Sequence, residues 1–181
     1  MSKLTSLFRL AAVVLAALTA GLQAGCGGQG AKQPDAAGGV PPATEAKSAD
    51  ACALLSGKEI ADIVANPTDE GRPFAGPEVC KWRTEDPSDV DVLLTVRAAG
   101  SIREKALCAD IRNAGDSARR VTGLGDVAVW KFAREGPMSN SGELEVCGPK
   151  GYVGLTLQGQ REEPTLKTAA VALAQKALGR L

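Results

Sequence analysis

The segment GELEVCGPKGYVGLTLQ, residues 142–158, carries the clearest fold signal in the sequence. Two strand-like runs, 142–147 and 152–158, flank the turn-forming residues Gly-Pro-Lys-Gly at 148–151, a pattern typical of a β-hairpin. Strands joined by so short a turn must pair antiparallel, because a parallel pair needs a crossover of about a dozen residues or more. The hairpin therefore predicts an antiparallel sheet.

Further strands are expected on the N-terminal side of this hairpin. Residues 90–96 alternate apolar and polar side chains with a period of two, which is typical of a half-buried strand. Shorter runs at 79–84 and 127–132 predict two more strands. Residues 67–79 are rich in Pro and Gly and are expected to form a loop.

Three helices are predicted around these strands. Ser56-x-x-Glu59 and Ser101-x-x-Glu104 have capping-box spacing and open the first two helices. The first should end before Asn66-Pro67, because proline biases its predecessor away from helix. Pro164 suits the first turn of a terminal helix that reaches residue 181. Together these elements predict one α+β domain over residues 50–181, an antiparallel sheet with helices packed on it.

The N-terminus has the order of a secretory signal. Lys3 and Arg9 form a positive segment, residues 10–20 are almost entirely apolar, and the small residues Ala24 and Gly25 follow. The apolar run is far shorter than the roughly 20 residues that span a bilayer. Residues 1–25 are therefore expected to be a signal peptide and not a permanent transmembrane helix.

Ala24-Gly25-Cys26 resembles the end of the lipobox of bacterial lipoproteins. The resemblance implies that Cys26 is lipidated and that the chain is held on the membrane of the cell envelope, outside the cytoplasm. Gly27-Gly28 resembles lipoproteins sorted to the outer membrane, where the host has two membranes. Residues 26–49 contain little that could be buried and predict a flexible tether. The alternative is a plain secreted protein in which Cys26 is free.

If Cys26 carries lipid, four cysteines remain for folding: Cys52, Cys80, Cys108 and Cys147. Export would place them in an oxidising compartment, where pairing is the default. Three connectivities are open. We favour Cys52–Cys80, which would tie the start of the first helix to the first strand, and Cys108–Cys147, which would tie the second helix to a central strand. A zinc site is disfavoured, because the chain has no histidine and no C-x-x-C pair.

Composition argues against most catalytic chemistry. The absence of histidine removes the commonest general base and the histidine-containing triads. The sequence also lacks a Walker A motif and the S-x-x-K spacing. Without Lys3 and Arg9 the chain has a net charge of −2, which gives no electrostatic basis for nucleic-acid binding. We therefore expect no enzyme activity, no cofactor, no metal and no nucleic-acid partner.

Two charged segments are candidate ligand sites. Glu85, Asp86, Asp89 and Asp91 offer oxygen ligands for calcium, but they lack the D-x-D-x-D-G pattern, so a solvated hairpin turn is favoured. Arg119-Arg120 could meet an anionic ligand, although a solvated turn before a strand is the better interpretation. Ligand-binding residues therefore stay undefined at this level.

The aromatic residues Trp82, Trp130, Phe132 and Tyr152 all fall on predicted strands. They could line a ligand groove. Such residues more often fill the core between a sheet and its helices, so we expect a packing role.

From Asp50 onward the layout resembles small bacterial envelope lipoproteins, chiefly actinobacterial, that share a domain of unknown function. The matching motifs are Cys52-Ala53-Leu54-Leu55, Cys80-Lys81-Trp82, the Gly-Leu-Gly-Asp-x-Ala turn at 123–128 and the helix at 164–181. The resemblance implies the Cys52–Cys80 disulfide. More distantly the layout is similar to extracellular sensor domains of bacterial receptor kinases, which have a ligand cleft. No catalytic residue can be assigned to this chain from the resemblance.

Three functions follow as hypotheses. The first is a non-catalytic envelope domain that binds a protein or small ligand through the sheet or its edge, and we favour it. The second is a structural or accessory subunit of an envelope complex. The third is a carboxylate-dependent hydrolase of envelope polymers, which would need two carboxylates facing each other across a cleft.

Overall fold

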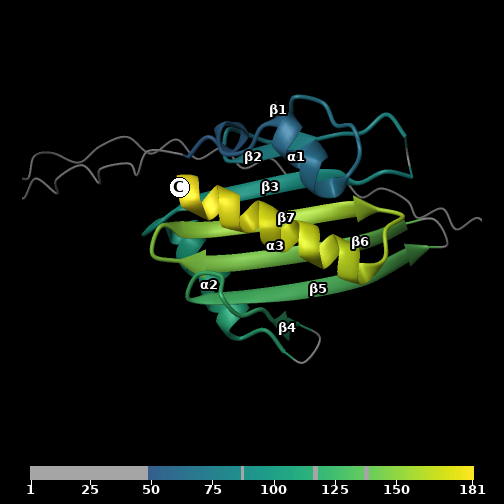
Figure 1. The fold of residues 1–181 in the computed structure, drawn as a ribbon. Helices are drawn as coiled ribbons and strands as arrows, with labels where there is room; N and C mark the ends of the chain where they lie inside the picture. The colour runs from purple at the N-terminus through teal and green to yellow at the C-terminus, as the bar shows by residue number, and fades with distance from the viewer. Residues whose placement is uncertain (1–48, 87, 116–117, 137–138) are drawn as a thin grey trace, which may run out of the picture. The chain divides into compact units, whose positions relative to one another are not determined.

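The computed structural model describes residues 49–86, 88–115, 118–136 and 139–181 (Figure 1). Residues 1–48, which include Cys26, the expected signal peptide and nearly all of the expected tether, lie outside this range. The elements, in chain order, are the 3-10 helix η1 (Ala51–Ala53), α1 (Gly57–Val64), β1 (Arg72–Pro73), β2 (Val79–Trp82), β3 (Asp91–Ala98), α2 (Ile102–Arg112), β4 (Arg119–Arg120), β5 (Val127–Gly136), β6 (Ser139–Gly148), β7 (Gly151–Gly159) and α3 (Glu163–Arg180).

All seven strands belong to one antiparallel sheet in the order β1-β2-β3-β7-β6-β5-β4. After β3 the chain passes through α2 to the far edge and returns strand by strand until β7 lies beside β3 (Figure 1). These two strands pair from Asp91 with Gln158 to Ala98 with Gly151. The α+β antiparallel class predicted from the sequence is confirmed.

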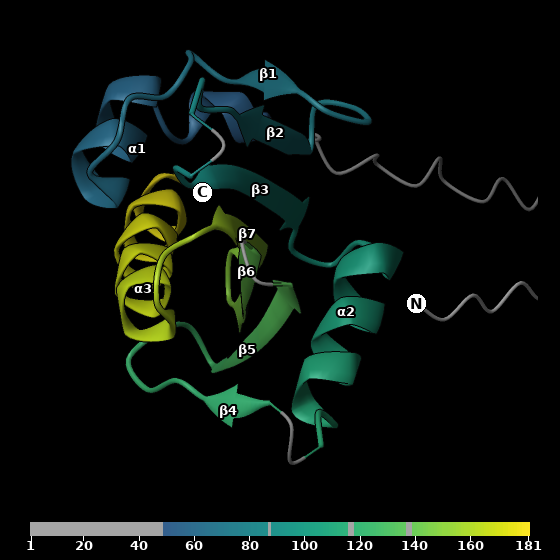
Figure 2. The same cartoon turned by 90° about the vertical axis from the view of Figure 1, so that its right-hand side faces the viewer.

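One face of the sheet, which we call the first face, packs against α3 and holds the main core (Figure 2). The strands alternate, so every second side chain points to this face. Its central side chains are fully buried and apolar: Val92, Leu94, Val96, Leu144, Val146, Val153, Leu155 and Leu157. The helix supplies Leu166, Ala170, Leu173, Ala174 and Ala177. Small alanines let α3 lie close to the strands.

The indole of Trp130 lies across Gly142 on the neighbouring strand, where a Cβ atom would come within 2.2 Å of the ring. Trp130 also donates from Nε1 to Glu163 at the start of α3, at 2.9 Å. This residue therefore fixes the position of α3 on the sheet.

The helices of the first face are joined by an ion pair. The predicted Ser56–Glu59 capping box opens α1, with the Ser56 side chain accepting from the Glu59 N–H. The Glu59 carboxylate also accepts two hydrogen bonds from Arg180, at 2.6 and 2.8 Å, while Arg180 donates to the Leu54 carbonyl. The end of α3 is thereby tied to the start of α1.

The opposite face of the sheet, which we call the second face, is covered only in part by α2 (Figure 2). Cys108 and Ile111 of α2 pack on Val129, Cys147 and Tyr152 to form a second, smaller core. As predicted, Ser101 caps this helix by accepting from the Glu104 N–H at 3.1 Å. No helix in the described part of the chain is both long and apolar enough to cross a membrane.

The structure corrects the sequence-based expectations at three places. The expected loop 67–79 contains the short edge strand β1, and the expected turn at Arg119-Arg120 is the edge strand β4. Strands β5 and β6 also extend beyond the predicted ends at 132 and 142, to Gly136 and back to Ser139. These residues carry no apolar alternation, because this end of the hairpin is mostly exposed.

Candidate functional site

The four cysteines of the domain form two disulfides, in the connectivity that the sequence favoured. Cys52 bonds to Cys80, joining η1 to β2, and Cys108 bonds to Cys147, joining α2 to β6. The first bond therefore starts from the 3-10 helix that precedes α1, rather than from α1. Both are consistent with an oxidising, extracytoplasmic location.

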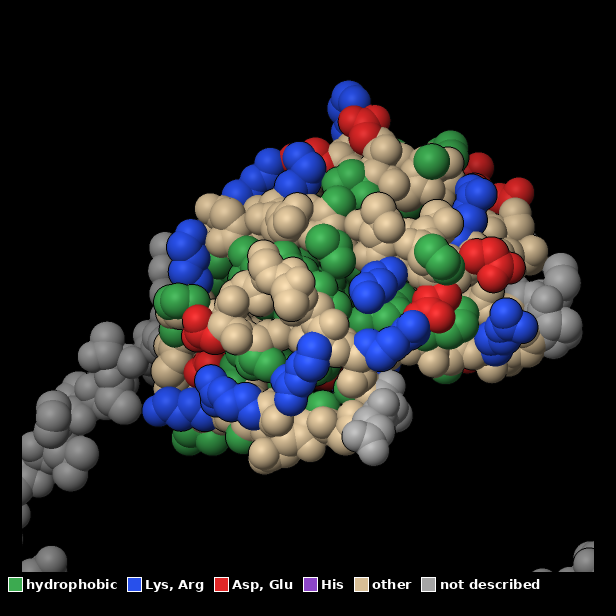
Figure 3. All heavy atoms as spheres, turned by 60° about the horizontal axis from the view of Figure 1, so that its bottom comes forward, with side chains coloured by type: hydrophobic (Ala, Val, Ile, Leu, Met, Phe, Trp, Pro, Cys, Tyr) green, Lys and Arg blue, Asp and Glu red, His purple; other side chains and the backbone are tan. Residues whose placement is uncertain are grey.

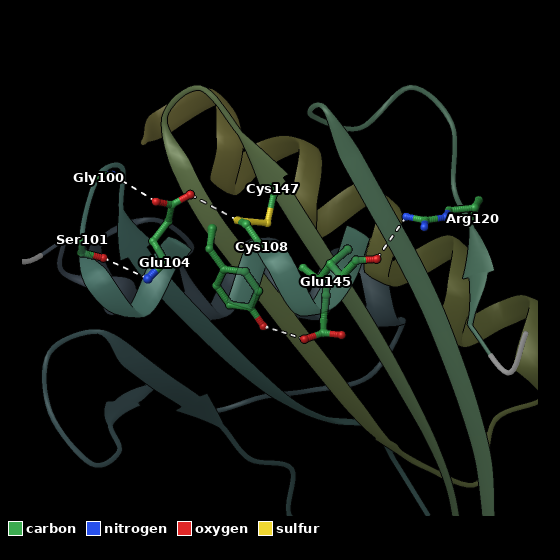
Figure 4. Close-up of a disulfide and its surroundings, with 9 residues drawn as sticks. Gly100, Ser101, Glu104, Cys108, Arg120, Glu145 and Cys147 are labelled. Carbon is green, nitrogen blue, oxygen red and sulfur yellow. Dashed lines mark hydrogen bonds between the residues drawn. A yellow bond between two sulfur atoms is a disulfide. The ribbon is translucent and has the colours of Figure 1, made fainter. Parts of the chain in front are cut away.

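The disulfide of the second face lies beneath a charged group (Figure 4). Glu104 Oε1 is 3.2 Å from the Cys108 sulfur, and Glu104 Oε2 accepts from the Gly100 N–H at 3.1 Å. A disulfide sulfur carries no hydrogen, so the first distance is a contact and not a hydrogen bond. At the other end of α2, Arg120 donates to the carbonyls of Ile111 and Arg112. The positive charge of Arg120 is attracted there to the negative end of the dipole of α2.

Beyond α2 the second face is open, and we call this part the open face. Its row from β2 to β5 reads Lys81, Leu93, Thr156, Glu143 and Lys131. The next row toward the free end of the sheet is Asp91, Gln158, Ser141 and Ala133. All nine side chains are partly or fully exposed. The open face is therefore mainly polar, in contrast to the buried apolar first face.

Several hollows meet where the open face reaches β1 and β2. A small one of about 100 Å³ lies between Phe74, Lys81, Leu93 and Thr156. Larger ones, of about 360 to 410 Å³, adjoin the free end of the sheet, and Arg83 borders three of them. The Arg83 side chain is exposed. Together these hollows form the candidate site.

Two side chains give the candidate site its character. Phe74 is 55% exposed, an unusual position for a large aromatic residue in this domain. Lys81 lies 3.4 Å from Asp91 on the neighbouring strand, and Asp91 also accepts from the Thr84 N–H at 3.0 Å. An aromatic ring beside paired charges offers both apolar contact and polar groups, as ligand sites commonly do.

A buried ionic cluster marks the boundary between the open face and α2. Glu145 is only 8% exposed and accepts from Lys131 at 2.5 Å and from the Tyr152 hydroxyl at 3.2 Å. Tyr152 reaches it by lying over Gly154, where a Cβ atom would come within 2.5 Å of the hydroxyl. Glu143 lies 3.5 Å from the same lysine. Every member of the cluster therefore has a partner.

The cluster keeps Tyr152 and Lys131 in their usual protonation states at neutral pH, because the pKa of each is raised. Burial, and then the negative charge of Glu145, raise the pKa of Tyr152 far above its ordinary value. Burial alone would lower the pKa of Lys131, but the carboxylates of Glu145 and Glu143 outweigh it and raise that pKa. The tyrosine therefore keeps its proton and the lysine its charge, an arrangement of ion pairing and not of an activated nucleophile.

The acidic run weighed as a calcium site is divided among separate partners. Asp86 accepts from the Ser88 N–H and hydroxyl, which lowers the pKa of Asp86. Asp89 lies 3.7 Å from Arg161, and Asp91 is held by Lys81. Among the residues that the structure describes, no three His, Cys, Asp or Glu side chains are placed to hold a metal ion.

The aromatic and arginine candidates serve packing and capping. Trp82 and Trp130 are fully buried in the main core, as expected, and Tyr152 is buried under α2. Arg119 forms an ion pair with Glu163 of α3, and its neighbour Arg120 caps α2. None of these side chains faces the candidate site.

A separate, shallow groove of about 530 Å³ lies between α1 and α3. Its lining is mainly apolar and consists of Ile63, Pro164, Thr165, Thr168, Ala169 and Ala172. It lies on the first-face side of the molecule, away from the open face. This groove carries few groups that could orient a small ligand.

Sequence reasoning missed Phe74, Arg83 and the Glu145 cluster as site residues. Phe74 and Arg83 meet because β1 pairs with β2, with Arg72 opposite Lys81. Of the cluster, only the Glu-x-Glu spacing at 143–145 could have been noticed in the sequence. The structure buries Glu145 and leaves Glu143 partly exposed. A scan of protein-family models, a search of curated proteins and a search of solved structures each find no match to this chain.

Proposed function

We propose that this protein is an extracytoplasmic lipoprotein, anchored through Cys26, whose α+β domain binds a ligand without catalysing a reaction. The observation that carries the binding role is the open face, with its hollows around Arg83 and the exposed ring of Phe74. A sheet face that is left uncovered while the opposite face is fully packed is available to a partner.

The composition of the open face favours a partner with both polar and apolar groups. Lys81 and Arg83 present cationic groups beside Phe74 and Leu93. Of the carboxylates that line these two hollows, Asp91 pairs with Lys81, and Asp69 accepts from the backbone N–H groups of Gly71 and Arg83. A small anionic molecule with an apolar portion, or a protein loop of the same chemistry, would suit this arrangement. The distant resemblance to sensor domains agrees with such a role.

The binding role is tested by site-specific photo-crosslinking in the envelope of a bacterial host. A photoreactive residue at Leu93, on the open face, should form an adduct of defined mass. The same residue at Gln175, exposed on α3, serves as the matched control. Adducts at both positions, or at neither, would contradict binding at the open face.

The anchor is tested independently of the binding site. Replacement of Cys26 by Ser removes the only thiol available for lipid in our proposal, so the chain should move from the membrane fraction to the soluble fraction. Intact mass before and after this change should differ by the acyl chains. An unchanged distribution between the fractions would contradict the anchor and leave the photo-crosslinking result unaffected.

A structural subunit is the second candidate. The apolar groove between α1 and α3 favours it, because Ile63 and Ala172 present apolar surface with little polar lining. An adduct formed through Ala172, and none through Leu93, would support this candidate over ligand binding.

A further inference from the structure

The outer edge of β5 continues beyond its edge neighbour. The short strand β4 pairs only with Val129 and Trp130 of β5. Within the described residues, no strand lies against the outer side of Lys131–Arg134. Figure 3 turns this side of the molecule toward the reader, and Lys and Arg side chains gather there.

The direction of the free backbone groups follows from the ladder. The Val121 N–H donates to the Ala128 carbonyl on the outer side, at 3.0 Å. In an antiparallel ladder the N–H and C=O of one residue point to one neighbour, and those of the next residue point to the other. The backbone groups of Phe132 and Arg134 therefore point outward, while those of Ala133 point to β6.

The side chains of this edge are sorted between the two faces. Phe132 packs against the main core on the first face, and by alternation Arg134 lies on the same face. Lys131 and Ala133 lie on the second face. Glu135 joins them there, since it accepts from Gln158 at 2.9 Å.

We propose that this edge pairs with the same edge of a second copy of the chain, antiparallel, with the two-fold axis at Ala133. Phe132 would then lie opposite the partner's Arg134, and each would satisfy the outward N–H and C=O of the other. Lys131 would face the partner's Glu135, placing opposite charges across the junction. The guanidinium of Arg134 would lie beside the ring of the partner's Phe132. The edge is thus complementary to itself, as a two-fold interface requires.

Other registers are less favourable. Centring the pair at Phe132 would set the partner's Arg134 against Trp130, whose outer side is already taken by Arg119. Centring it at Arg134 would place the axis at the irregularity between Arg134 and Gly136. The other sheet edges are two-residue strands, and β1 contains Pro73, which cannot donate.

Cysteine cross-linking in the full-length chain tests the register. In the proposed pair, Ala133 faces the partner's Ala133 at a closely spaced position, with Cα atoms about 4.5 Å apart. This lies within the range of about 4.4–6.8 Å that a disulfide spans. Ala133→Cys should therefore give covalent dimer when the intact envelope is oxidised, roughly tenfold more than Glu135→Cys. The Glu135 positions lie about 14 Å apart, since four residues separate them along the ladder.

Proline at the edge supplies the second test. Arg134→Pro removes an N–H that points away from β6, so the fold should persist while the cross-link of Ala133→Cys disappears. Circular dichroism and thermal unfolding verify that Arg134→Pro is folded. Equal cross-linking of both cysteine variants, none from either, or no effect of the proline would overturn the pairing. Dimer in the parent chain would come from Cys26 and would count against the lipid anchor instead.

Discussion

The two faces of the sheet are built from the same strands but are held in different ways. The first face is continuous and apolar, and α3 covers it mainly through packing, with polar contacts at the two ends of the helix. The second face is half covered by α2, which a disulfide and an arginine cap hold in place above a buried carboxylate. The comparison teaches that a large apolar core supports the layer of α3, whereas α2 rests on a smaller core, depends more on its disulfide and arginine cap, and leaves room for a partner.

Removing the disulfide of the second face should have the largest effect. Cys108→Ala combined with Cys147→Ala opens a loop with a sequence separation of 39. The chain-entropy model gives a loss of about 4 kcal/mol in the free energy of unfolding. Hydrogen exchange should show α2 amides losing protection while β3 and β7 amides keep theirs in the native state. If the α2 amides exchange as slowly in this variant as in the parent, the disulfide is not what holds α2 on the sheet. The control, Cys52→Ala with Cys80→Ala, should leave α2 protected.

Neighbouring residues of β7 compare the two faces directly. Leu155→Ala removes a fully buried side chain from the first face and should cost about 3 kcal/mol. Thr156→Ala changes a partly exposed side chain of the open face and should cost less than about 0.5 kcal/mol. Denaturant unfolding measures both. Similar losses in the two variants would contradict the assignment of the core to one face.

The buried carboxylate of the second face should have an intermediate effect. Glu145→Gln removes the nearer and more buried of the two carboxylates that pair with Lys131 and should cost about 1–2 kcal/mol, whereas Glu143→Gln, at a more exposed position, should cost almost nothing. Tyr152 is the chain's single tyrosine, so the absorbance of tyrosinate reports on it alone. In Glu145→Gln its pKa should fall toward the ordinary value of 10.0 but stay above it, because burial remains the larger cause. An unchanged tyrosine titration would show that Glu145 does not act on Tyr152.

The ion pair that joins the helices of the first face should give the smallest effect, visible as a pH dependence. The hydrogen bonds from Arg180 hold the pKa of Glu59 well below its ordinary value of 4.5. A carboxyl whose pKa is depressed in the folded state stabilises the fold above its unfolded pKa and loses that contribution as the pH falls below it. The melting temperature of the parent should therefore exceed that of Glu59→Gln at neutral pH, and the gap should narrow below pH 4.5. A gap that stays constant over this range would argue against the ion pair.

Local signals in the sequence were sufficient for much of the fold. The two S-x-x-E motifs located the starts of α1 and α2, although a full capping box forms only at α1, and the Gly-Pro-Lys-Gly turn located the hairpin of β6 and β7. Each of these signals acts over a few residues, so no knowledge of the tertiary structure is needed. The antiparallel sheet followed from the short turn, and the disulfide connectivity that we favoured among three is the one observed.

The edges and the candidate site could not be predicted in this way. Arg72–Pro73 and Arg119–Arg120 become strands only because a longer strand lies beside each. The approach of Phe74 to Thr156 depends on three strand pairings, of which those of β1 with β2 and of β2 with β3 are local in the sequence, whereas that of β3 with β7 is not. The pairing of strands therefore determines both the edge strands of the sheet and which side chains lie together at the candidate site.

The Cys52–Cys80 bond also determines how the domain responds to mechanical force. Tension applied to the chain on the N-terminal side of Cys52 passes through the sulfur bridge directly into β2. The residues between the two cysteines, including α1 and β1, form a closed loop that the disulfide prevents from extending. Once the hydrogen bond from the Ala51 N–H to the Pro77 carbonyl gives way, pulling from that side loads the junction of β2 and β3, and α1 lies outside the path of the force.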